Sequence, residues 1–81
     1  MNDAEVLAHI EKLVSEEDGL YAHAADGHGM DGEQKRRLHE IQVHLDQCWD
    51  LLRQRQARRE FGMDPDEAKV RSAEMVERYT G

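Results

Sequence analysis

The stretch that decides the fold is LHEIQVHLDQCWDLL, residues 38–52. Its apolar residues recur at alternating steps of three and four: Leu38, Ile41, Leu45, Cys48 and Leu52. This spacing places them on one face of an α-helix and is typical of a helix that packs along another helix. The pattern predicts a helix over residues 33–61, about 43 Å long at about 1.5 Å per residue, that ends at Gly62.

The apolar face of this helix widens around Trp49. Trp49 and Leu51 flank it on opposite sides, which gives a broad patch of Leu45, Cys48, Trp49, Leu51 and Leu52. One facing helix cannot cover such a patch, so we expect it to contact the C-terminal tail, a second copy or another protein. For Trp49, a place in a core or dimer core and a role as a hot spot for a different protein are both open.

The N-terminal segment carries a second helical pattern. Asn2 is a good N-cap and Glu5 completes a capping box, so a helix is expected over about residues 3–18, with an extension to 25 allowed. Its apolar positions form one line with a second line beside it: Leu7, Ile10, Val14 and Tyr21, then Val6, Leu13 and Leu20. Residues 26–32, DGHGMDG, are predicted to be the connecting loop.

The C-terminal tail, residues 62–81, has weaker helical signals. Asp64 and Pro65 are typical of the start of a short turn, and Ser72 is expected to cap another that carries Met75, Val76 and Tyr79. We therefore predict an all-α protein with one domain over residues 1–81. We expect a two-helix antiparallel, coiled-coil-like hairpin with a short, partly helical tail. Two such chains are expected to pair into a homodimeric four-helix bundle.

Composition explains why a second copy is expected. Leu, Ile, Val and Phe make up about 19% of the 81 residues, while 36% are charged and the net charge is −7. So few large apolar residues form a core only if they are shared with a partner. No apolar run approaches the length of a membrane span. The acidic N-terminus and the single cysteine favour a cytoplasmic protein without a disulfide.

The charges are also unevenly distributed along the chain. Residues 1–33 carry a net charge of −8, residues 34–60 of +3 and residues 61–81 of −2. An acidic segment followed by a basic one favours packing the two predicted helices side by side.

No pattern typical of catalysis is present, so no catalytic residue and no cofactor are predicted. The expected function is a non-enzymatic helical interaction or regulatory module. His44 and Cys48 raise an alternative, since they lie four residues apart on one helical face. Two copies could combine these side chains into a tetrahedral metal site, or His44 could lower the pKa of Cys48 and give a redox thiol. However, Cys48 lies on the apolar line, where a cysteine usually acts as a small hydrophobe.

A basic cluster raises a second alternative: Arg53, Arg55, Arg58 and Arg59. These arginines could contact a nucleic acid, or they could pair with the acidic residues of the first helix. The net charge of −7 makes a general nucleic-acid binder the less favoured interpretation.

Residues 45–59, LDQCWDLLRQRQARR, followed by DPDEA at 64–68 and by Val70 and Arg71, resemble a known family. The chain is similar to the small actinobacterial proteins of domain of unknown function 2630 over nearly its whole length. The resemblance implies a short, cytosolic, helical-hairpin protein without an assigned activity. It implies no catalytic or binding residues.

Overall fold

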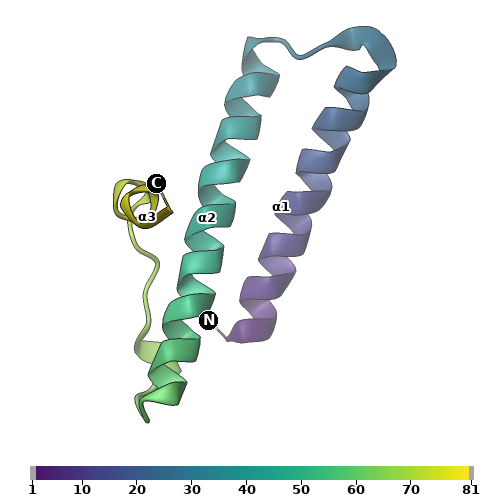
Figure 1. Ribbon diagram of the computed structural model, residues 1–81. Helices are drawn as coiled ribbons and strands as arrows, with labels where there is room; N and C mark the ends of the chain where they lie inside the picture. Colours follow the sequence, from purple (N-terminus) through teal and green to yellow (C-terminus); the bar gives the residue numbers. More distant parts are fainter. Residues whose placement is uncertain (1, 81) are drawn as a thin grey trace.

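The computed structural model describes residues 2–80, except for the side chains of residues 28 and 78–80. Two long helices dominate the fold: α1 is Asp3–His23 and α2 is Gly32–Glu60. They lie side by side in opposite directions and are joined through a wide helical turn, η1, Ala24–His28 (Figure 1). A 3-10 turn, η2 (Pro65–Glu67), and a third helix, α3 (Ala73–Thr80), follow. The described residues contain no strand, and the prediction of an all-α protein is confirmed.

Local sequence determines where the two long helices begin. The Asn2 side chain accepts a hydrogen bond from the Glu5 N–H at 2.8 Å, and the Glu5 carboxylate accepts one from the Asn2 N–H at 3.1 Å. Asp31 and Gln34 form the same reciprocal pair at the start of α2, at 2.8 and 3.0 Å. Each capping box satisfies backbone N–H groups that have no partner inside the helix.

The connection between the two long helices, residues 24–31, overlaps the predicted 26–32 loop but begins with the helical turn η1. Helix α1 continues through Gly19 to His23, although a glycine inside a helix costs about 1 kcal/mol, and Leu20 is half-buried. The chain then turns at Gly27 and Gly29, whose φ values of 87° and 66° lie in the left-handed region that favours glycine. Gly32 already belongs to α2.

The apolar core is thin. Six apolar side chains are buried among those that the structure describes: Val6, Ile10, Leu13, Ile41, Leu51 and Val76. On α1 the predicted apolar face is therefore only partly buried: Ile10 is buried with Val6 and Leu13, whereas Leu7, Val14 and Tyr21 stay 38–49% exposed. The apolar surface of α1 is wide enough that either its Leu7 side or its Val6 side could face α2. The packing is shifted toward the side of α1 that carries Glu16, which reaches Arg37 of α2.

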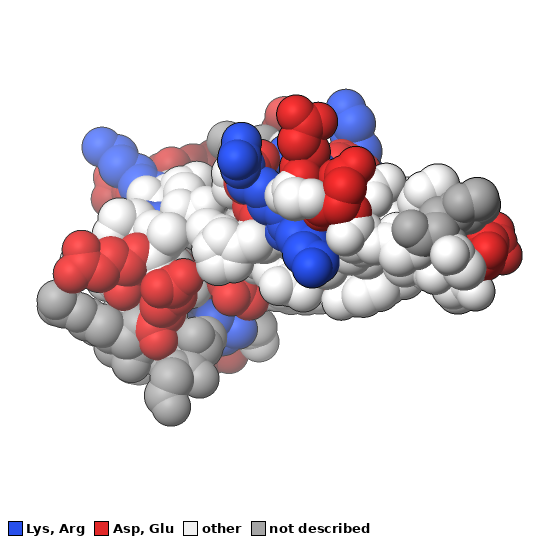
Figure 2. Space-filling model, turned by 90° about the horizontal axis from the view of Figure 1, so that it is seen from above, with Lys and Arg blue, Asp and Glu red and all other residues white. Residues whose placement is uncertain are grey.

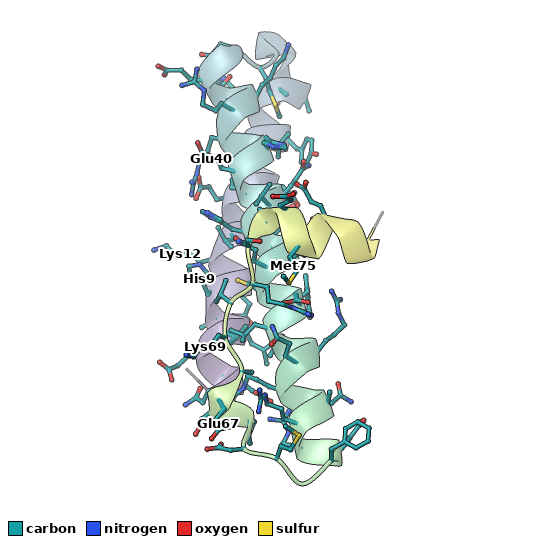
Figure 3. The ribbon with its side chains drawn as sticks, turned by 90° about the vertical axis from the view of Figure 1, so that its left-hand side faces the viewer. His9, Lys12, Glu40, Glu67, Lys69 and Met75 are labelled. Atoms are coloured by element: carbon teal, nitrogen blue, oxygen red, sulfur yellow. The ribbon has the colours of Figure 1, made fainter. Side chains whose placement is uncertain are left out.

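The tail folds back on α2. At the end of α2, Gly62 adopts a φ of 72°, and the Met63 N–H donates to the Arg58 carbonyl at 2.7 Å, so the chain reverses direction. Residues 64–72, which we call the strap, then run along α2 toward α3 (Figure 3). Glu67 and Lys69 mark its path in that view.

Helix α3 lies across α2, on the side away from α1 (Figures 1 and 3). Its Val76 is buried, and the Ser72 hydroxyl accepts a hydrogen bond from the Met75 N–H at 3.3 Å. The side chain of Tyr79, expected on this turn, lies outside the described residues. The molecule measures 51 × 25 × 15 Å, and no helix among residues 2–80 is long and apolar enough to cross a membrane.

Candidate interaction surface

The α1–α2 pair has two edges, and one of them carries an ion pair and a hollow. Here the Arg37 guanidinium donates to the Glu16 carboxylate, with one hydrogen bond of 2.8 Å. These bonds hold the pKa of Glu16 below its ordinary value and raise the pKa of Arg37. His9 of α1 and His44 of α2 also lie on this edge, since both line the same hollow.

The opposite edge is apolar and partly exposed. On α1, Leu7, Val14 and Tyr21 lie about 70° round the helix from the buried residues, on the side away from His9 and Glu16. They repeat every seven residues, and their exposed fractions are 44%, 38% and 49%. A seven-residue repeat keeps side chains along one line of a helix, so the three residues form a stripe.

Helix α2 contributes to the same edge. Trp49 lies about 70° round α2 from the residues that face α1, on the side away from Arg37 and His44, and is 46% exposed. Leu38, Leu45 and Leu52, again seven residues apart, are half-buried beside it. We call this surface the open face; it consists of Leu7, Val14, Tyr21, Leu38, Leu45, Trp49 and Leu52. The strap lies on the other edge, where Val70 lines the hollow with His9, and α3 crosses α2 on the side away from α1 (Figures 1 and 3).

A buried carboxylate fastens the strap to α2. Asp50, whose side chain is 3% exposed, accepts two hydrogen bonds from Arg71, one of them 2.8 Å long, and one from Gln54 at 2.9 Å. The bonds from Arg71 hold the pKa of Asp50 below its ordinary value, although burial acts in the opposite direction. Gln54 and Gln47 also donate to the backbone carbonyls of Lys69 and Arg71, at 2.9 and 3.1 Å.

Two arginines of the predicted basic cluster join the ends of the fold. Arg55 is 5% exposed and donates to Asp3 of α1, to Asp66 at 3.0 Å and to the Pro65 carbonyl at 3.1 Å. Arg59 reaches Asp3 at 2.8 Å. The hydrogen bonds from Arg59, and then from Arg55, lower the pKa of Asp3. Arg55 is therefore a structural residue with a satisfied charge.

The other two arginines differ from each other. Arg58 lies 3.5 Å from the Glu67 carboxylate of the strap. No ion pair is recorded for Arg53 within the part of the chain that the structure describes, and its side chain is exposed. At the opposite end of the molecule, which is seen from above in Figure 2, basic and acidic groups are likewise interspersed. Three of the four clustered arginines thus face carboxylates of the same chain.

His44 and Cys48 line one shallow hollow of about 200 Å³, together with Val6, His9, Gln47, Leu51 and Val70. Burial raises the pKa of the Cys48 thiol, which disfavours the reactive thiolate at neutral pH. Among the described residues, no three of the His, Cys, Asp and Glu side chains gather closely enough to hold a metal ion. The hollow is lined mostly by apolar groups.

The residues of the patch predicted around Trp49 lie in different surroundings. Leu51 is buried, and Cys48 lies at the hollow, whereas Leu45 and Leu52 are half-buried and Trp49 is exposed on the open face. Sequence reasoning missed Leu7, Val14 and Tyr21 as members of this surface, although their seven-residue repeat was visible. It also missed Asp50 as a buried group, because its burial comes with the contact to Arg71, 21 residues away in the chain.

Comparison with known proteins supports the family resemblance. The family described as "Protein of unknown function (DUF2630)" matches residues 2–81. The uncharacterized proteins Rv0898c of Mycobacterium tuberculosis and Mb0922c of Mycobacterium bovis are each 53% identical over 79 residues, which cover 98% of this chain and 91% of theirs. No solved structure shows a significant match. The resemblance to small actinobacterial proteins is confirmed, and the chain belongs to the DUF2630 family.

Proposed function

We propose that the protein is a non-enzymatic helical interaction module of the cytoplasm, and that the open face is its working surface. The observation that carries this proposal is the difference between the two edges of the α1–α2 pair. Ion pairs, the hollow and the strap occupy one edge, whereas exposed Leu7, Val14, Tyr21 and Trp49 line the other. Exposed apolar side chains gathered on one face are typical of protein-binding surfaces.

The chemistry of the remaining groups supports this proposal over the two alternatives. A metal or thiol role would use His44 and Cys48, but the pKa of the thiol is raised and no third ligand is close among the described residues. A nucleic-acid role would need arginines free to contact phosphates, yet Arg55, Arg58 and Arg59 face carboxylates. Arg53 alone would add only a small electrostatic attraction to the phosphates of a nucleic acid.

Site-specific photocrosslinking in cells tests the proposal. A photoreactive phenylalanine analogue is placed at Trp49, on the open face, or at Arg36, an exposed position of α2 away from it. We expect crosslinked species, of the chain with itself or with another protein, from position 49 and not from position 36. Circular dichroism verifies that both variants keep the helical fold. Equal yields from the two positions, or none from position 49, would contradict the proposal.

A further inference from the structure

We infer that the open face binds a second copy of this chain, arranged so that α1 of each protomer packs over α2 of the other. This inference rests on the proposed function and names the partner of the same surface. Three observations support it: the amount of surface the chain leaves exposed, the length of its repeats and the sign of the charges along its rims.

The exposed surface is too large for a compact monomer and suits a dimer. The chain exposes 5747 Å², against roughly 5,000 Å² for a compact protein of its mass. Its radius of gyration is 15.1 Å, against about 12 Å for a compact domain of this length. The larger exposed surface and the larger radius of gyration both indicate that the monomer is extended rather than compact.

The open face has the apolar area that a stable interface needs. Leu7, Val14, Tyr21 and Trp49 keep between 38% and 49% of their surface exposed, together roughly 350 Å² for side chains of about 150–250 Å² each. The half-buried leucines of α2 add to this area. A standard interface buries about 800 Å² on each partner, a little more than half of it apolar. The apolar area of the open face therefore matches the area that one protomer contributes to a standard interface.

The repeats indicate a helical partner of equal length. Leu7, Val14 and Tyr21 hold a seven-residue repeat along most of α1, and Leu38, Leu45 and Leu52 hold one along α2. Such a repeat keeps the stripe aligned with an opposing helix over several turns. A short peptide or a small ligand would leave most of the stripe uncovered. A second copy supplies two helices with the same repeat and the same length.

The charges at the rims of the open face select the packing mode. Helical spacing places Glu11 and Asp18 at the outer rim of α1, and Lys35, Asp46, Arg53 and Glu60 at the outer rim of α2. When α1 packs over the partner's α2, an acidic rim meets a rim in which Lys35 and Arg53 balance Asp46 and Glu60, so no like-charged rims face each other. When α1 packs over the partner's α1, acidic residues face acidic residues, which is unfavourable. The first arrangement has its two-fold axis parallel to the helices.

Sedimentation equilibrium of the full chain tests whether the partner is a second copy. We expect twice 9.4 kDa for the wild type. Trp49→Glu places a charge at the centre of the face and counts twice in a two-fold interface, so dimerisation should weaken by about 100-fold or more. The control is Met75→Glu on α3, because Met75 is 45% exposed, as Trp49 is 46%, but lies outside the open face. It should leave the dimer intact.

Disulfide trapping tests the packing mode. The Asp3–Arg59 and Glu16–Arg37 ion pairs fix the register of α1 and α2, which places Val14 near the level of Leu45. In a Cys48→Ala background, chains with Val14→Cys and chains with Leu45→Cys should form a disulfide only when mixed. A disulfide between two Val14→Cys chains, or no disulfide in any sample, would overturn the arrangement.

The two proposals fail in different ways. A wild-type chain of 9.4 kDa at all concentrations, or equal dimer affinities for Trp49→Glu and Met75→Glu, would overturn the second-copy inference. Crosslinks from position 49 to a different protein would then still support the interaction module. Absence of any crosslink from position 49, together with a monomer, would reject both.

Discussion

Replacement of Asp50 by asparagine should destabilise the fold far more than the same change at a neighbouring exposed position. The Asp50 carboxylate is 3% exposed and accepts three hydrogen bonds, two from Arg71 and one from Gln54. An asparagine keeps the shape but has one oxygen, no charge, and an NH₂ group that must face other donors. A net contribution of about 1.5–3 kcal/mol is typical of hydrogen bonds to charged groups. Because Arg71 is 33% exposed and regains water, we expect a loss of about 2–3 kcal/mol for Asp50→Asn.

Urea unfolding followed by circular dichroism at fixed protein concentration measures this loss. A decrease of 2–3 kcal/mol corresponds to a melting temperature about 10–20 °C lower for a domain of this size. The matched control is Asp46→Asn, an exposed aspartate on the same helix, which should change stability by less than about 0.5 kcal/mol. A double-mutant cycle with Arg71→Met should show strong coupling. Equal effects of Asp50→Asn and Asp46→Asn, or additive effects in the cycle, would refute the assigned role of Asp50.

Three further predictions follow from burial, capping and titration. Ile41→Ala removes a fully buried side chain and should cost about 2–4 kcal/mol in urea unfolding; a loss below 1 kcal/mol would argue against the core position. Asp31→Ala removes the cap of α2 and should lower the free energy of unfolding by about 1 kcal/mol in thermal melts, whereas no change would contradict the cap. The pKa values of Asp3 and Asp50 are lower in the fold than in the unfolded chain, so stability should be full above about pH 5 and fall as these carboxylates protonate below about pH 4. Urea midpoints that stay constant between pH 5 and pH 3 would rule out this contribution.

Short-range patterns were sufficient to predict the helices and their starts. The three- and four-residue steps from Leu38 to Leu52 determine α2, and Asn2 with Glu5 determines the start of α1, because both depend on groups within one or two turns. The course of the strap was not predictable. It depends on Arg71 reaching Asp50 across 21 positions of the chain, and neither residue carries a local pattern for that contact.

The face of α1 that meets α2 was also beyond local reasoning. Val6 and Leu7 both belong to seven-residue repeats, and both are apolar, so the helix alone does not determine which repeat is buried. The packing partner decides it, and Val6 is 1% exposed whereas Leu7 is 44% exposed. Likewise, the basic cluster was visible as a run of arginines, but their pairing with Asp3 and Glu67 depends on where α1 and the strap lie.

Isotope-filtered NOE spectroscopy on a dimer of one labelled and one unlabelled chain tests most directly whether a second copy occupies the open face. It records only contacts between protomers. We expect intermolecular contacts from the Trp49 indole to the methyl groups of Leu7 and Val14 in the partner. A spectrum with the line widths of a 9.4 kDa monomer and no intermolecular contact from Trp49 would contradict it.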